Sequence, residues 1–174
     1  MKKLFTNILV IVLISVNCNS LATVILKKAK SFTVIDNIIK QEISAKDIHS
    51  TLLVFDDDDT LMNMPTILGS SAWWYWQSHL LKSKNFFHAE ADSISQLIVE
   101  NKAIMSQESM MLTDTTIPNY LQQWKNAGYN LLIETARSST FNTLTDQQLS
   151  QVKILRFFNN KTNNKYILFH KNYI

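Results

Sequence analysis

Residues 51–61 read TLLVFDDDDTL, an apolar run that leads directly into four consecutive aspartates. Because the run from Leu52 to Phe55 contains no polar residue, it predicts a strand buried on both faces, as in a parallel sheet. Carboxylates a few ångströms apart repel one another, so a site that gathers them usually holds a divalent cation or keeps one proton in the pair. In an extended chain Asp56, Asp58 and Thr60 share one face. The stretch therefore predicts a charged site where a buried strand ends.

A second part of the chain repeats this order of elements. Residues 116–128 predict a helix closed by a glycine, and the apolar residues 129–133 predict a second buried strand, which is followed by Thr135. Strands that alternate with helices predict a three-layer, Rossmann-like α/β domain with a parallel sheet, in which reactive residues collect at the carboxyl ends of the strands. Asp56, Asp58 and Thr135 all fall at such ends.

The rest of the chain predicts elements around this core. Between Met62 and Thr116, an aromatic run from Trp73 to Trp76 and a helical stretch from Ala91 to Met105 indicate a mostly helical insertion. Large aromatic side chains favour the interior, so we expect the aromatic run to pack; an exposed run would instead be a binding surface. We also expect helices over 36–43 and 141–151, and strands over 154–158 and 166–170.

Residues 1–22 have the pattern of an export signal. Two lysines precede an apolar stretch, and Ser20-Leu21-Ala22 provides a small-x-small cleavage site. We expect the mature domain, residues 23–174, to be exported to the periplasm or secreted, with no stable membrane insertion. A retained anchor is the alternative, but the apolar stretch is shorter than the roughly 20 residues that span a bilayer.

The charge of the chain argues against nucleic acid as a partner. Removing Lys2 and Lys3 from the 17 basic residues leaves 15 against 14 acidic residues, a formal charge of +1. Binding to nucleic acid needs a clustered basic face, which this composition does not indicate. The one cysteine lies in the predicted signal, and the four histidines lack the paired spacing of a zinc site.

Two motifs resemble those of the haloacid dehalogenase superfamily. Val54 to Leu61 resembles the first motif, an apolar strand followed by Asp-x-Asp-x-Thr, and Leu131 to Thr135 resembles the second, a strand ending in Ser or Thr. Together with the export signal, two further groups are similar to an exported, haloacid-dehalogenase-like family of intracellular bacteria known as a domain of unknown function: Gly69-Ser70 with Trp73 nearby, and Thr135-Ala136-Arg137.

This resemblance implies a Mg²⁺-dependent phosphohydrolase acting on a small phosphorylated substrate. Asp56 would be the nucleophile that forms an aspartyl phosphate, and Asp58 the acid and base. Thr60 would orient the loop and Thr135 would hydrogen-bond a phosphoryl oxygen. Mg²⁺ would bridge Asp56 and the phosphate, with the carbonyl of Asp58 as a further ligand, beneath a cap formed by the insertion. Arg137 would either help to hold phosphate or form a structural salt bridge.

The chain departs from the superfamily pattern near its end. The third motif supplies a lysine and the fourth an acidic pair that completes the metal site, but no acidic residue follows Asp146. Lys165 and Lys171 are the candidates for the lysine. We therefore expect a C-terminally truncated chain with impaired catalysis and an open sheet edge. The alternative is a catalytically inactive remnant or an exported protein that binds a protein partner.

Overall fold

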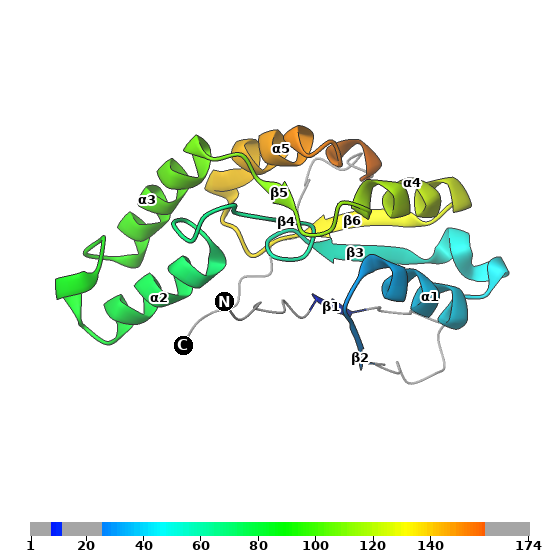
Figure 1. Cartoon of the computed structure of the whole chain (residues 1–174), viewed down its shortest axis with the longest axis horizontal. Helices are drawn as coiled ribbons and strands as arrows, with labels where there is room; N and C mark the ends of the chain where they lie inside the picture. Colours follow the sequence, from blue (N-terminus) through cyan, green and yellow to red (C-terminus); the bar gives the residue numbers. More distant parts are fainter. Residues whose placement is uncertain (1–7, 12–25, 159–174) are drawn as a thin grey trace.

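The structure is a computed structural model that describes residues 8–11 and 26–158 (Figure 1). Its strands and α-helices are β1 (Ile8–Ile11), β2 (Leu26–Ala29), α1 (Phe32–Glu42), β3 (Leu52–Asp56), β4 (Met62–Asn63), α2 (Ser71–Lys82), α3 (Ile94–Gln107), β5 (Met111–Leu112), α4 (Ile117–Ala127), β6 (Asn130–Glu134) and α5 (Asn142–Gln151). Short 3-10 helices are η1 (Ala45–Ser50), η2 (Phe86–His88), η3 (Ser139–Phe141) and η4 (Leu155–Phe157). Within these two ranges, every helix is too short or too polar to cross a membrane.

The centre of the molecule is a parallel pair of strands, β3 and β6. They pair in register from Leu52 with Asn130 to Asp56 with Glu134, so both strands end at the same edge. Across the described residues this parallel sheet has two strands. The structure is therefore a mixed α/β fold with a small parallel sheet, while the larger three-layer core remains a prediction.

The two central strands are fully buried on one face only. Leu53, Phe55 and their partners on β6 are buried, whereas Val54 is half-buried and Leu52 is 43% exposed. The prediction of a strand buried on both faces is therefore wrong for the described chain. The apolar run misled the interpretation because aliphatic residues also occur on a half-covered face of a sheet.

Aromatic stacking joins the buried face to the helices. The ring of Phe55 on β3 stacks on Trp124 of α4 at a centroid distance of 5.7 Å, and Phe32 of α1 lies 6.2 Å from the same indole. The indole N–H of Trp124 donates a 2.9 Å hydrogen bond to Oδ1 of the buried Asp36 on α1. Trp124 is thus a core residue that ties two helices and one strand together.

The local signals around α4 behave as predicted. Pro118 lies in its first turn, and Gly128 ends the helix in the left-handed conformation with a φ of 101°. A left-handed residue after a helix lets the chain reverse and is most easily supplied by glycine. The reversal delivers β6 beside β3.

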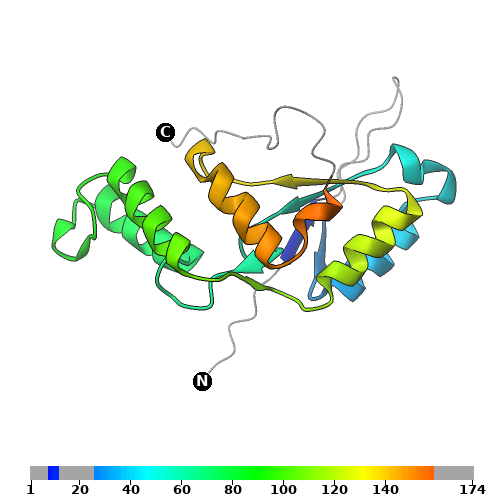
Figure 2. The same ribbon diagram turned by 90° about the horizontal axis from the view of Figure 1, so that it is seen from above.

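The segment between β4 and β5 is mostly helical, as predicted. Helices α2 and α3 pack together and extend away from the central strands, and the antiparallel pair β4 and β5 joins them to the core (Figures 1 and 2). The aromatic run divides along α2. Trp73 is buried, whereas Tyr75 is 67% and Trp76 is 51% exposed.

Two expected strands have other outcomes. Residues 154–158, predicted as a strand, instead contain the 3-10 helix η4 with Ile154 and Phe157 buried. The prediction is wrong because α5 ends in a tight turn, in which Lys153 has a φ of 64° and the N–H of Ile154 donates to the carbonyl of Leu149. The predicted strand over 166–170 lies outside the described residues.

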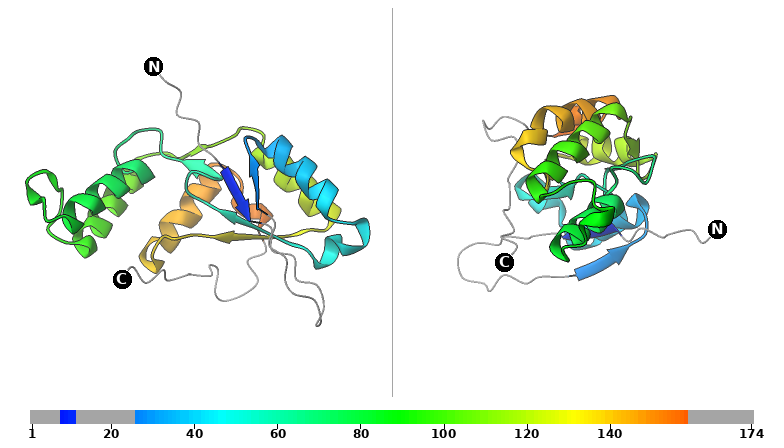
Figure 3. Two further views of the ribbon diagram at one scale, coloured as in Figure 1. Left: turned by 90° about the horizontal axis from the view of Figure 1, so that it is seen from below. Right: turned by 90° about the vertical axis from the view of Figure 1, so that its left-hand side faces the viewer.

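The first part of the chain contributes one described strand. β1 pairs antiparallel with β2, from Ile8 with Ala29 to Ile11 with Leu26, and Figure 3 shows this pair on the side of the central strands opposite α5. The predicted cleavage site lies outside the described residues, so removal of residues 1–22 stays a prediction.

Candidate functional site

Polar side chains meet at the edge where β3 and β6 end. Asp56 closes β3 opposite Glu134, and Thr135 and Arg137 follow directly after β6. Parallel strands in register place these residues at one end of the sheet. The structure therefore brings together the Asp56–Asp58 segment, Thr135 and Arg137, which the sequence placed there from strand order alone.

The loop after β3 is tightly wound. The carbonyl of Asp57 accepts hydrogen bonds from the backbone N–H groups of Leu61 and Met62, each at 3.0 Å, and Asp59 adopts a left-handed φ of 57°. Aspartate is one of the non-glycine residues that enter this region most readily. This turn leads the chain from β3 into β4, and the alternation of buried and more exposed residues in β3 continues through Asp57 and Asp58.

Asp56 is an exposed residue at the end of β3. Its Oδ2 accepts a long hydrogen bond of 3.4 Å from the hydroxyl of Thr60. Although the residue retains solvent contact, partial burial of its carboxyl group, followed by repulsion from Asp58, raises the pKa of Asp56 to about 6. Thr60 is buried, and its carbonyl accepts a 2.5 Å hydrogen bond from the hydroxyl of Thr113. Thr60 thereby links the aspartate loop to the chain beyond β5.

Asp57 points into the protein and is completely buried. Its Oδ1 accepts hydrogen bonds from the hydroxyl of Thr135 at 2.8 Å and from the backbone N–H of Asp58 at 2.7 Å. Its Oδ2 lies 3.3 Å from Nε of Arg137, within ion-pair distance, but accepts no hydrogen bond from the residues that the structure describes. Burial and the charge of Asp58 raise the pKa of Asp57, and Arg137 opposes that rise.

Sequence reasoning missed the role of Asp57. The available signal was its position directly after a strand whose alternate residues are buried, which an aspartate occupies only with partners. Those partners include Thr135, which the sequence had assigned to a phosphate.

Arg137 is the cation of the cluster. Its Nε donates to Oδ2 of Asp58 at 2.7 Å and its Nη2 donates to Oδ1 at 2.5 Å, the two-point geometry that suits guanidinium and carboxylate. Its Nη1 donates to Thr145 at 3.0 Å and to Gln148 at 2.8 Å, both on α5. Burial lowers the pKa of Arg137, but the hydrogen bonds with Asp58 and the charge of Asp57 outweigh it and raise that pKa.

The comparison with known families gives one match. The model of the family described as "Protein of unknown function (DUF2608)" matches residues 28–172. The chain belongs to this family. Residues 28–172 include both central strands and every member of the cluster, so the DUF2608 match covers the site and the central sheet. No curated protein and no solved structure matched the chain.

The side chains of this DUF2608 site do not fit a magnesium ion as they are placed. Mg²⁺ takes oxygen ligands in near-octahedral geometry, usually with one or two carboxylates. Both carboxylate oxygens of Asp58 are bonded to Arg137, and Asp57 faces inward. Within the described part of the chain, no group of three or more His, Cys, Asp or Glu side chains is arranged to hold a metal. This placement disagrees with the expected metal ligands, Asp56 and Asp58, and their binding of Mg²⁺ stays a prediction.

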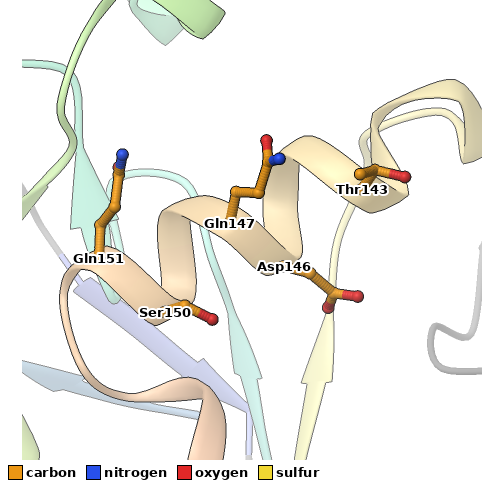
Figure 4. A pocket seen from close by; sticks show the side chains of 5 residues that line it. All are labelled: Thr143, Asp146, Gln147, Ser150 and Gln151. Carbon is orange, nitrogen blue, oxygen red and sulfur yellow. The ribbon is translucent and has the colours of Figure 1, made fainter.

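A separate hollow lies on α5. This open, polar depression is lined by Thr143, Asp146, Gln147, Ser150 and Gln151, all from one helix (Figure 4). None of the cluster residues lines it. The opposite side of α5 carries the buried Thr145 and Gln148 that hold Arg137, so one helix separates the hollow from the cluster.

The lysine expected from the third motif is not placed by the structure. Lys165 and Lys171, the two candidates, lie outside the described residues. Arg137 is the cationic side chain that the described chain brings to Asp57 and Asp58.

Proposed function

We propose that the chain is a phosphoryl-transfer domain of the haloacid dehalogenase type by descent, with Asp56 as the phosphoryl acceptor. The observation that supports it is the exposed position of Asp56 at the end of a parallel strand, with neither of its oxygens bonded to Arg137. An ionised carboxylate in this position is a nucleophile for the phosphorus atom of a small phosphorylated compound.

The engagement of Asp58 limits which phosphate donors can react. In transfer, the bond from an Asp56 oxygen to phosphorus forms as the bond from phosphorus to the leaving oxygen breaks, and a poor leaving group must receive a proton. Asp58 is the candidate donor, but both of its oxygens accept hydrogen bonds from Arg137. We therefore propose that donors with good leaving groups phosphorylate Asp56, whereas alkyl phosphates are hydrolysed slowly or not at all.

The test is labelling of Asp56. Purified protein is incubated with acetyl phosphate or an aryl phosphate, with and without added Mg²⁺, and its intact mass is measured for one added phosphoryl group. We expect labelling that Asp56→Asn abolishes. Asp59→Asn is the matched control, because it removes a carboxylate from the same loop, and it should still be labelled. Absence of labelling in the folded protein, or labelling that persists in Asp56→Asn, would contradict the proposal.

A second candidate function is binding without catalysis. The observation that favours it is the exposure of aromatic side chains in the helical insertion, namely Tyr75, Trp76 and Phe87, the last at 89% exposed. Exposed aromatic groups of this kind often contact protein partners. A folded protein that shows neither labelling nor turnover, and that binds a partner through Trp76, would support this candidate instead.

Export is part of the same proposal. We propose that residues 1–22 are removed and that the mature chain acts in the periplasm or outside the cell, in line with the signal pattern. Terminal sequencing of the protein from cell fractions tests it. A mature chain that begins at Thr23 supports the proposal, and an intact Met1 in the cytoplasm contradicts it.

A further inference from the structure

The Asp57–Asp58 pair carries two carboxylates beside one guanidinium. We propose that Arg137 is the built-in counter-cation of this pair and occupies, in terms of charge, the place that a divalent cation takes in other carboxylate clusters. The folded state of the site then needs no metal. This inference goes beyond the proposed function and does not depend on whether Asp56 is phosphorylated.

The contacts of Arg137 account for nearly all of its hydrogen-bonding capacity. Nε and Nη2 each donate to one oxygen of Asp58, and Nη1 donates to Thr145 and Gln148. A guanidinium has five N–H donors, so one N–H on Nη2 is left over. The guanidinium of Arg137 therefore points toward Asp57 and Asp58.

Because Arg137 and Asp57 are buried, each of their charges needs a partner of opposite charge. The side chain of Arg137 is 6% exposed and that of Asp57 is 0% exposed. Removing one member of such a buried pair leaves an uncompensated charge, which costs far more than the loss of a surface ion pair. Among residues 8–11 and 26–158, none donates a hydrogen bond to Oδ2 of Asp57, so the guanidinium, whose Nε lies 3.3 Å away, is its main compensation there.

Helix α5 holds the guanidinium directly, and α3 supports α5 through a hydrogen bond to Gln148. Thr145 and Gln148 on α5 accept from Nη1, and the side-chain amide of Gln148 donates a 3.1 Å hydrogen bond to the carbonyl of Met105 near the end of α3. On the strand side, the backbone N–H of Arg137 donates to the hydroxyl of Thr135 at 3.2 Å. The guanidinium is therefore held between the two aspartates and α5, and the backbone of Arg137 is tied to Thr135.

The electrostatic consequence concerns divalent ions. With Arg137 in place, the two carboxylates are half neutralised and both oxygens of Asp58 are engaged, so an added ion must displace a buried guanidinium. Without Arg137 the two carboxylates lack a cation, and a divalent ion becomes the available compensation. Divalent ions should therefore stabilise a variant that lacks this arginine and leave the wild type unaffected.

The experiment compares thermal unfolding of the full chain and of Arg137→Gln, each with EDTA and with millimolar Mg²⁺, Ca²⁺ or Mn²⁺. We expect less than about 1 °C of change in the wild-type midpoint. The midpoint of Arg137→Gln should be lower in EDTA and should rise by roughly 3 °C or more with a divalent ion. A wild-type midpoint that rises as much as that of the variant, or a variant that does not respond to any of the three ions, overturns the proposal.

A double variant keeps the test decisive if Arg137→Gln does not fold. Arg137→Gln combined with Asp58→Asn removes one negative charge along with the positive one, and the second substitution keeps the shape of the Asp58 side chain. If Arg137 acts as the counter-cation, the double variant unfolds at a higher temperature than Arg137→Gln alone. If the two substitutions add, or if neither variant folds, the arginine acts through its contacts with α5 and the proposal is overturned.

Discussion

Arg137 holds Asp58 by two parallel hydrogen bonds, from Nε to Oδ2 at 2.7 Å and from Nη2 to Oδ1 at 2.5 Å. The sequence offered two readings of this arginine, a phosphate contact and a structural salt bridge. In the structure Arg137 forms ion pairs with Asp57 and Asp58, which corresponds to the structural salt bridge. The geometry also places the arginine between the two central strands and α5.

Asp58→Asn should destabilise the protein by about 1–3 kcal/mol, because it leaves the buried guanidinium with Asp57 as its one anionic partner. Solvent screening limits this loss, since the side chain of Asp58 is 33% exposed. Urea unfolding measures the change. Glu42→Gln is the matched control: the Glu42 side chain is 30% exposed, but its partner Lys27 is 37% exposed, so we expect less than about 1 kcal/mol. Equal losses in the two variants would contradict the prediction.

Trp124→Phe should cost about 2–4 kcal/mol of unfolding free energy. The substitution removes part of a ring that is 1% exposed, and it removes the indole donor of the buried Asp36. Chemical unfolding provides the measurement. Trp76→Phe makes the same chemical change on a side chain that is 51% exposed, and its expected effect lies within about 0.5 kcal/mol. If Trp124→Phe leaves the free energy of unfolding unchanged, the aromatic stack between α1, β3 and α4 contributes little to stability.

The sequence predicted the elements whose signals are local. Pro118 and Gly128 bound α4 in sequence and in structure, and the order of strand, helix and strand brought Asp56 and Thr135 to one edge. The hydrogen-bond partners of the site residues could not be predicted from local sequence signals. Whether Thr135 bonds a phosphate or Asp57 depends on the turn at Asp57, which is set by backbone hydrogen bonds from Leu61 and Met62.

The errors also have a physical origin. The apolar composition of Leu52 to Phe55 does not record which face is covered, because Leu52 and Val54 are as hydrophobic as their buried neighbours. Residues 154–158 have a strand-like composition, but the left-handed Lys153 and the bonds that Lys125 donates to the carbonyls of Arg156 and Phe157 favour η4. Tertiary contacts overrode local propensity there.

Gly128→Ala should destabilise the protein by about 1–2 kcal/mol, the cost of placing a Cβ atom in the left-handed conformation. The φ of Gly128 is 101°, and an added Cβ would also meet the ring of His49. His49 is exposed and can adopt another rotamer, so we expect the left-handed backbone conformation of residue 128 to cause most of the loss. The double variant His49→Ala and Gly128→Ala distinguishes the two causes. We expect it to recover little stability, and full recovery would assign the loss to the ring contact.

The raised pKa of Asp56 predicts a pH dependence with a definite sign. Its folded-state pKa of about 6 lies above the ordinary value of 3.8, so between these values the folded protein binds more protons than the unfolded chain. The stability contribution of this group is therefore fully present below about pH 4 and is lost as the pH rises through about 6. Asp57, whose pKa burial also raises, acts in the same direction.

Asp56→Asn mimics the protonated form, so its unfolding midpoint should exceed that of the wild type more near pH 8 than near pH 5. Asp114→Asn is the control of opposite sign. Burial raises the pKa of Asp114, but hydrogen bonds from the hydroxyl and the backbone N–H of Thr116 outweigh it and lower that pKa. Its replacement should lower the midpoint at both pH values. An Asp56→Asn midpoint that tracks the wild type across this range would show that the carboxyl group is neither desolvated nor repelled by Asp58.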